Sequence, residues 1–174
     1  MSHPSQIEFV RSVMARHPDK FVGVSVLEVG SLNINGSIRQ FFFDCDYLGV
    51  DIGPGSCVDL VARGEDLDFP DGHFDTTASC ECFEHNPNWK ETFLNMVRMT
   101  RPGGLVFFSC ATTGRAEHGT TRTSPIDAPY CGDYYRNLTR EDFEPLCKDF
   151  AEYEFSEAHP PHDLYFRGIK NVLS

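Results

Sequence analysis

Short apolar runs alternate with amphipathic segments along most of this chain, and this alternation limits the possible folds more than any other feature. Residues 22–29 read as an apolar run, which is typical of a strand buried on both faces of a sheet. Before this run, Ile7, Val10, Val13 and Met14 are spaced to give a helix one apolar face. Alternating strands and helices favour a parallel sheet that is covered by helices on both faces.

The same alternation predicts the other elements in the first two thirds of the chain. Asn86 and Pro87 are typical of a helix start, with asparagine as the cap and proline in the first turn. Trp89 and Phe93 begin the apolar stripe of this helix, which the Arg-Pro-Gly-Gly sequence at residues 101–104 is expected to end. We expect a short helix at residues 37–43 and further strands at residues 47–52, 58–61, 74–79 and 105–111.

The segment after the fifth expected strand breaks this rhythm. Residues 112–138 are rich in Gly, Thr, Pro, His and Tyr and show no clear period. A long irregular loop within a compact domain is usually functional or mobile. Beyond the loop, Thr139 resembles the cap of a helix over residues 140–150. Residues 152–156 and 164–172 are then expected to close the chain as an antiparallel pair of strands.

The charge and cysteine content narrow the classes of function. The 15 basic and 26 acidic residues give a formal net charge of −11, which argues against nucleic-acid and anionic-membrane partners because their phosphates would be repelled. No segment approaches the ~20 apolar residues of a membrane-spanning helix, and the first residues lack the pattern of a secretory signal. The seven cysteines include no C-x-x-C pair, so we predict no metal site and expect reduced thiols in a cytoplasmic protein.

A group of polar residues and glycines surrounds the ends of the first two expected strands. Glu28 and Gly30 end the first strand, Gly36 lies where the next helix begins, and Asp51 ends the second strand, 21 residues after Gly30. A glycine turn lets a ligand approach the backbone, and an acid at this spacing can accept hydrogen bonds from two ribose hydroxyls. Together these residues favour a cofactor that contains a nucleoside.

The glycine pattern argues against a dinucleotide. A dinucleotide fold uses G-x-G-x-x-G to hold a pyrophosphate, whereas residues 30–36 read Gly-Ser-Leu-Asn-Ile-Asn-Gly and lack the central glycine. Glu28 would also repel a phosphate, but it would suit an ammonium or a nearby sulfonium. An NAD-dependent oxidoreductase therefore remains an alternative of lower rank.

With these motifs in order, the sequence resembles the class I S-adenosylmethionine-dependent methyltransferases, in particular small, single-domain members of the type 11 kind. The matching motifs are VLEVG with Gly36, YLGVDI, Gly64-Glu65-Asp66-Leu67, FDTTASCECFEH and RPGGLVFFSC. The resemblance implies an α/β, Rossmann-like, doubly wound sheet of seven strands in the order 3-2-1-4-5-7-6, mostly parallel with an antiparallel C-terminal strand. It also implies one domain over residues 1–174, with a cofactor-binding half (22–111), a substrate-side loop (112–138) and a closing helix and hairpin (139–174).

The resemblance further implies roles for individual residues toward S-adenosylmethionine, whose product is S-adenosylhomocysteine. The residues beside the methionine part would be Glu28, Gly30, Ser31 and Gly36. The residues beside ribose and adenine would be Asp51, Ile52, Asp66 and Leu67. The residues on the sulfonium side would be Cys80 and Glu81. Asn33 and Asn35 stand where a second glycine is common, and asparagine tolerates the left-handed backbone better than most residues.

Two histidines and two residues of the irregular segment are candidates for the acceptor side. Ligands of this fold class bind outside the carboxyl ends of the strands, which the 112–138 loop can cover. His118, or else His85, could accept a proton from a hydroxyl or amine acceptor. Tyr134 and Arg136 could contact the substrate, and the alternative is that they only tie the loop to the sheet.

The function that these patterns favour is methyl transfer from S-adenosylmethionine to an O or N atom of a small-molecule or glycan acceptor. One alternative is a methyltransferase fold that binds ligands without catalysing transfer, since a chain of 174 residues leaves little length for a substrate domain. A homo-oligomer, in which a second copy closes the pocket, is a further expectation that the sequence leaves open.

Overall fold

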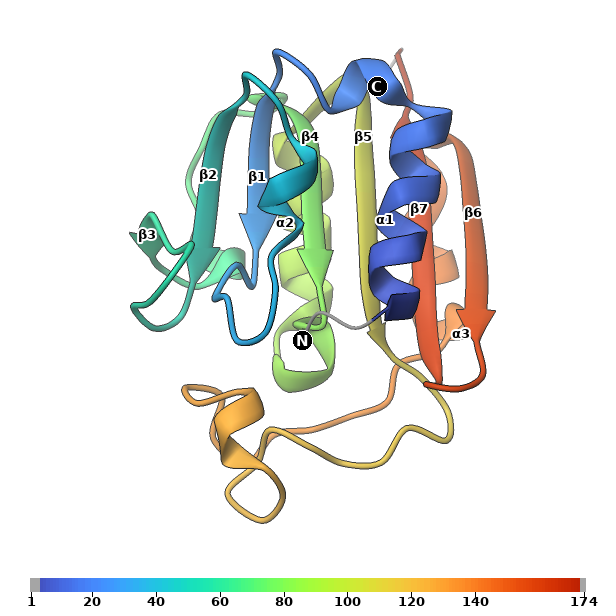
Figure 1. The fold of residues 1–174 in the computed structure, drawn as a ribbon. Coiled ribbons are helices and arrows are strands. Elements are labelled where there is room, and N and C mark those ends of the chain that lie inside the picture. The colour runs from blue at the N-terminus through green and yellow to red at the C-terminus, as the bar shows by residue number, and fades with distance from the viewer. Residues whose placement is uncertain (1–3, 173–174) are drawn as a thin grey trace.

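The computed structural model describes residues 4–172, which build around a seven-stranded sheet in the order β3-β2-β1-β4-β5-β7-β6 (Figure 1). The strands are β1 (Ser25–Val29), β2 (Asp46–Asp51), β3 (Leu60–Val61), β4 (Phe74–Cys80), β5 (Thr100–Ala111), β6 (Phe150–Ala158) and β7 (Asp163–Lys170). Neighbouring strands from β3 to β5 are parallel, and β7 is antiparallel to both β5 and β6. The predicted fold class and strand order are confirmed.

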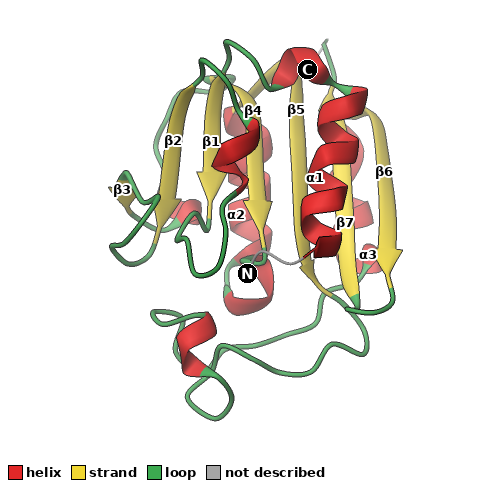
Figure 2. Ribbon diagram, in the orientation of Figure 1, coloured by secondary structure: helices red, strands yellow, loops and turns green. Residues whose placement is uncertain are grey.

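Helices cover both faces of the sheet (Figure 2). Helix α1 (Pro4–Arg16) lies on one face, and α2 (Trp89–Met99) and α3 (Arg140–Phe143) lie on the other. Strand β5 contributes side chains to the cores on both faces of the sheet, because successive side chains of a strand point to opposite faces. Phe107 packs in the core beneath α1, whereas Phe108 packs in the core beneath α2 and α3.

Several element boundaries differ from the sequence-based expectation. The first strand begins at Ser25 rather than at residue 22, after Gly23 with a φ of +66°. The helix expected from Asn86 begins at Trp89, because the Asn86 side chain accepts a hydrogen bond from the Asn88 N–H (2.8 Å) and forms a turn before the helix. Residues 101–104 do not end this helix as a turn but lie within β5.

The closing part of the chain is also less helical than expected. Only α3 is an α-helix, and residues Glu144–Asp149 continue as a 3₁₀-helix. The predicted cap at Thr139 is present, since its N–H donates to the Asp142 carboxylate at 2.9 Å. The short helix expected at residues 37–43 is a 3₁₀-helix over Ile38–Phe41, which the Ser37 hydroxyl caps by accepting from the Arg39 N–H.

The irregular segment, residues 112–138, crosses below the carboxyl ends of β1, β2 and β4 (Figure 1). Its only helical element is a short 3₁₀-helix, Pro125–Asp127. Within residues 4–172, the helices lack the length and apolar character that a membrane crossing requires. The arrangement leaves the carboxyl edge of the sheet covered by a loop rather than by a helix.

Candidate functional site

A cavity of about 260 Å³ lies at the carboxyl edge of the sheet, between the ends of β1, β2 and β4 and the covering loop. This is the edge at which parallel α/β sheets bind their ligands. The cavity lining includes most of the residues that the sequence singled out, namely Glu28, Gly30, Ser31, Gly36, Asp51, Ile52, Cys80, Glu81, His85 and Tyr134.

The turn after β1 is shaped by close packing against the end of β4. Gly30 has a φ of +83°, and a Cβ built on it would lie 2.5 Å from the Cβ of Cys82, so only glycine fits there. The N–H groups of Gly30 and Ser31 both donate to the Val50 carbonyl. Further along, the Asn33 side chain accepts from the Gly36 N–H at 2.7 Å and holds the loop that replaces the usual glycine-rich turn.

Asp51 joins the loop after β1 to the end of β2. Its carboxylate accepts hydrogen bonds from the Leu32 N–H (3.1 Å) and the Gly53 N–H (3.3 Å). Burial raises the pKa of Asp51, and the hydrogen bond from Leu32 partly offsets this shift. The carboxylate therefore faces the cavity from a position that two backbone groups fix.

Glu28 is a nearly fully buried carboxyl group in the cavity wall. The Tyr47 hydroxyl donates to it at 2.7 Å, and burial raises its pKa to about 7. The neighbouring Ser31 hydroxyl is buried and has no hydrogen-bond partner within the described part of the chain. Buried polar groups are normally paired, so Glu28 and Ser31 offer an acceptor and a hydroxyl to a ligand.

Two residues of the predicted cofactor set lie outside the cavity lining. Gly64–Asp66 form a 3₁₀ turn that leaves Asp66 exposed, and Leu67 packs into the core beneath α2. The cavity wall is formed instead by the preceding residues 62–65. The sequence motif located this segment, but the turn changes which of its side chains face the cavity.

The predicted covering loop contributes wall residues that the sequence did not identify individually. Residues 127–131 line the cavity, and the Tyr130 ring lies directly on Gly53, where a Cβ would meet it at 2.0 Å. The Tyr130 hydroxyl donates to the Pro54 carbonyl at 3.1 Å. Gln6, from α1, also lines the cavity. No periodic pattern marks these positions, because they depend on how the loop folds back over the sheet.

Arg136 does not line the cavity. Its guanidinium pairs with Asp142 at 2.6 Å, and its backbone N–H donates to the Glu84 carbonyl at 2.9 Å. The guanidinium carbon also lies 5.9 Å from the centre of the Trp89 ring. These contacts tie the covering loop to α2, to α3 and to the turn after β4, which was the structural alternative for this residue.

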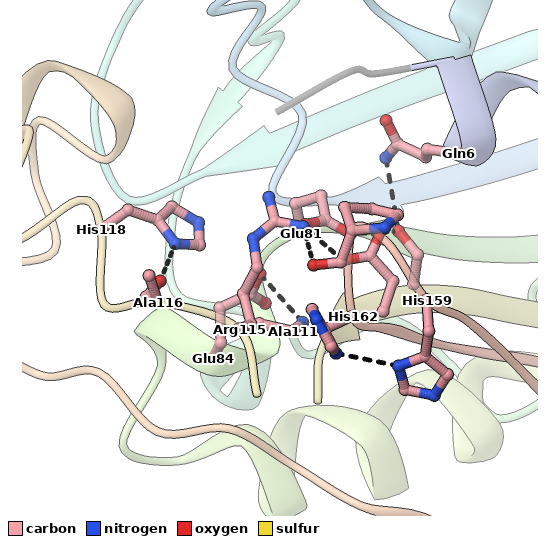
Figure 3. Close-up of polar contacts among 12 residues, drawn as sticks. Gln6, Glu81, Glu84, Ala111, Arg115, Ala116, His118, His159 and His162 are labelled. Atoms are coloured by element: carbon pink, nitrogen blue, oxygen red, sulfur yellow. Dashed lines mark hydrogen bonds and ion pairs between the residues drawn. The ribbon is translucent and has the colours of Figure 1, made fainter. Parts of the chain in front are cut away.

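The two predicted histidines lie together, but only His85 is part of the cavity lining, and His118 lies behind it. The ring centres of His85 and His118 are 5.0 Å apart, and the Tyr135 ring packs against both. Burial, with the nearby His118, lowers the pKa of His85 to about 3. The His118 Nδ1 atom lies 3.1 Å from the Ala116 carbonyl (Figure 3). Glu81 and Glu84 both belong to the turn after β4, which is strained because Glu81 has a φ of +56°.

The comparisons with known proteins agree with this architecture. Residues 27–108 match a protein-family model described as "Methyltransferase domain". The chain resembles the crystal structure of *Burkholderia thailandensis* 1,6-didemethyltoxoflavin-N1-methyltransferase with bound 1,6-didemethyltoxoflavin and S-adenosylhomocysteine. The TM-score is 0.65 at 17% identity, over 94% of this chain and 78% of that chain. No curated protein sequence matches the chain significantly.

Two further solved structures share the fold. *Haemonchus contortus* phosphoethanolamine N-methyltransferase 2 in complex with S-adenosyl-L-methionine gives a TM-score of 0.70 at 15% identity, over 94% of this chain and 52% of that chain. The CurJ carbon methyltransferase gives a TM-score of 0.63 at 16% identity, over 93% of this chain and 52% of that chain. The chain thus spans about half the length of these two proteins. By name, one is a nitrogen methyltransferase and the other a carbon methyltransferase, on one shared fold.

Proposed function

We propose that this chain, a class I S-adenosylmethionine-dependent methyltransferase by family match and fold, transfers a methyl group to an O or N atom of a small-molecule or glycan acceptor. The observation that carries this proposal is the cavity in which Asp51 and Glu28 face the same space beside the Gly30 turn.

The cavity residues fit the cofactor group by group. Asp51 would accept hydrogen bonds from the ribose hydroxyls, and Glu28 would accept from the ammonium of the methionine part. The unpartnered Ser31 hydroxyl supports this assignment, because a polar ligand would supply the partner that the described chain does not. Ile52, which is 39% exposed in the cavity wall, would pack against adenine, with residues 62–65 at its edge.

The residues Cys80, Glu81 and Gly36 complete the proposed cofactor contacts. S-adenosylmethionine would supply the methyl group already activated on its sulfonium, so the chain mainly has to align the acceptor and exclude water. Burial raises the pKa of the Cys80 thiol to about 12, so this thiol stays protonated and does not compete with the acceptor as a nucleophile.

The acceptor would enter beside the covering loop. Tyr134 and His85 line the cavity there, and residues 127–131 close it on the adenine side. Tyr134 would contact the acceptor. The assignment of His118, or of His85, as a proton acceptor stays a prediction, and Arg136 would act on the acceptor only through the loop that its contacts hold.

The proposed function is tested by calorimetric titration of the chain with S-adenosylmethionine, S-adenosylhomocysteine and NADH, followed by methyl transfer from isotope-labelled S-adenosylmethionine to pools of small molecules and glycans. We expect one-to-one binding of the first two ligands, no binding of NADH, and transfer to an acceptor. Binding of NADH alone would support an oxidoreductase instead. Cofactor binding without transfer to any pool would support a non-catalytic binding protein.

Tyr130 allows a test of the covering loop. Replacing Tyr130 with alanine removes the ring from Gly53 and the hydrogen bond to Pro54, so the loop should cover the cavity less often. We expect the affinity for S-adenosylhomocysteine to fall by about threefold to tenfold, the effect of losing about 1 kcal/mol of interaction. The matched control is Tyr153→Ala, an exposed tyrosine on β6, which should leave the affinity unchanged. Equal affinities for the Tyr130→Ala variant and the unmodified chain would show that the loop does not act as a cover.

A further inference from the structure

Three side chains beside the cavity, of which His85 lines it, form a set with the chemistry of a metal site. Glu84, His85 and His118 each present one possible ligand atom, and these atoms all lie within 4.8 Å of one another. Ligands on opposite sides of a bound transition-metal ion are about 4.2 Å apart, twice the usual ~2.1 Å bond. Small side-chain rotations would therefore bring all three atoms to a common ion.

Each of the three side chains has one buried polar atom without a hydrogen-bond partner in the described part of the chain. Within residues 4–172, Glu84 Oε2, His85 Nδ1 and His118 Nε2 are buried and accept or donate no hydrogen bond. The whole side chain of Glu84 is buried, and His85 is only 5% exposed. Buried polar atoms are rarely left unpaired, because each one costs about 1–3 kcal/mol. Three such atoms on three neighbouring side chains indicate a missing partner there.

The surrounding contacts prepare one of these atoms for coordination. A carbonyl can only accept a hydrogen bond, so the contact of His118 Nδ1 with the Ala116 carbonyl at 3.1 Å places the ring proton on Nδ1 (Figure 3). This leaves the lone pair on Nε2, which is the buried atom without a hydrogen-bond partner in the described chain. Metal-binding histidines usually have their other nitrogen held in this way by a carbonyl or carboxylate.

The carboxyl groups near the set also favour the binding of a cation. Glu81 and Glu84 are both buried carboxyl groups of the turn after β4. One Glu81 oxygen accepts from the Ser109 hydroxyl at 2.8 Å, and the other is buried without a partner in the described chain. The nearby Arg115 is paired with the buried Asp163 at 2.7 Å. Within residues 4–172 neither carboxyl group has an ion pair, so ionising both of them is costly, and a divalent ion would offset that cost.

We propose that Glu84, His85 and His118 bind a divalent transition-metal ion of the Mn²⁺ to Zn²⁺ series. Two imidazoles and one carboxylate suit such an ion better than Mg²⁺ or Ca²⁺, which prefer oxygen ligands only. Three protein ligands leave coordination positions open, as in catalytic rather than structural sites. His85 belongs to the cavity wall, so an open position would face the cavity. That this position would then hold an oxygen of the methyl acceptor rests on the proposed function, whereas metal binding itself does not.

The covering loop is part of this site, because it supplies His118. The next residue, Gly119, has a φ of +68°, and a Cβ on it would lie 2.7 Å from the His85 ring and 2.7 Å from Ala128. Glycine therefore lets the loop pack directly on His85. A metal ion would join the loop to the turn after β4 and would order it over the cavity.

The test measures metal binding directly on the untagged chain, after treatment with a chelator that is then removed. The chain is titrated with MnCl₂, ZnCl₂ and MgCl₂ by calorimetry, and bound Mn²⁺ is counted from its electron paramagnetic resonance signal. The variants are His118→Ala and Glu84→Gln. The matched control is His159→Ala, which disrupts the exposed group of His159, His162 and Glu157, the other place where histidines and a carboxylate meet in the described chain.

We expect one equivalent of Mn²⁺ or Zn²⁺ in the unmodified chain and in the His159→Ala control, with weaker binding of Mg²⁺. The affinity should fall by about 100-fold or more in His118→Ala and in Glu84→Gln, since losing even a supporting contact typically costs 10- to 100-fold. His118 lies on a loop, so its variant should keep the circular dichroism spectrum of the folded chain. The same samples are titrated with S-adenosylhomocysteine, which separates this inference from the proposed function.

Two results would overturn the inference. One is the absence of Mn²⁺ and Zn²⁺ binding in a chain that binds S-adenosylhomocysteine, which would leave the proposed function intact. The other is metal binding that His159→Ala removes and His118→Ala retains, which would place the ion on the surface. Binding of metal that depends on His118 in a chain that does not bind S-adenosylhomocysteine would support the metal site and contradict the proposed function.

Discussion

Replacing Asp51 with alanine is expected to weaken the binding of S-adenosylhomocysteine by about 100-fold. The carboxylate is the proposed acceptor for two ribose hydroxyls, and losing a charged acceptor in a partly buried site costs about 2–3 kcal/mol. The substitution also frees the Leu32 and Gly53 N–H groups, which lose the carboxylate that now holds the loop after β1. The change is measured by calorimetric titration.

Two companion variants define what the Asp51 result means. Asp51→Asn keeps one acceptor oxygen and should lose less affinity than the alanine variant. Asp46→Ala removes an exposed aspartate from the opposite end of the same strand and should bind S-adenosylhomocysteine as the unmodified chain does. If Asp51→Ala and Asp46→Ala bound equally well, Asp51 would not hold the ribose.

Replacing Glu28 with glutamine is expected to weaken cofactor binding and, at the same time, to stabilise the fold at high pH. The pKa of Glu28 is raised to about 7, so the group is largely protonated at pH 5.5 and largely ionised at pH 8.5. Only the ionised form attracts an ammonium, and the affinity of the unmodified chain for S-adenosylhomocysteine should therefore rise as the pH increases through about 7. In Glu28→Gln this rise should be absent.

The ionisation of Glu28 strengthens cofactor binding as the pH rises, but it lowers the stability of the fold. The folded chain holds this proton more tightly than the unfolded chain, in which the pKa is near 4.5, so the free energy of unfolding falls as the pH rises from about 4.5 through 7. The fall is on the order of 3 kcal/mol when complete. Glutamine removes it, so the melting temperature of Glu28→Gln should exceed that of the unmodified chain by several degrees at pH 8.5 and by little at pH 5.5.

Thermal unfolding at the two pH values checks this prediction. Glu8→Gln is the matched control, since Glu8 is an exposed glutamate on α1 and should show no such pH-dependent difference. A melting temperature of Glu28→Gln that stayed equal to that of the unmodified chain at pH 8.5 would mean that ionised Glu28 costs nothing in the fold. The proposed exchange of stability for ligand binding at this residue would then be wrong.

The sheet was predictable from the sequence because its strands are short and mostly apolar and are separated by clear turns. Boundaries were less predictable where side chains compete with the backbone. Asn86 carries the signature of a helix cap, yet its side chain forms a turn and moves the helix start to Trp89. Residues 101–104 resemble a turn but lie inside β5, as an irregularity between Thr100 and Leu105, the two residues that pair with β4 on either side of it.

Site residues at the ends of strands could be predicted from the sequence, whereas site residues on the covering loop could not. Glu28, Gly30 and Asp51 could be found because each ends a strand, and parallel strands bring their carboxyl ends to one edge. Tyr130 and residues 127–129 could not be found, because their position depends on the path of an irregular loop. The sequence brought Glu84 and His85 together as neighbours, but only the folded loop places His118 beside them.

A crystal structure of the chain grown with S-adenosylhomocysteine tests the central claim most directly. The account predicts the compound in the cavity at the ends of β1, β2 and β4, with both ribose hydroxyls within hydrogen-bond distance of Asp51 and the ammonium beside Glu28. Electron density for the compound at any other place, or a cavity that holds it with its ribose turned away from Asp51, would contradict the account.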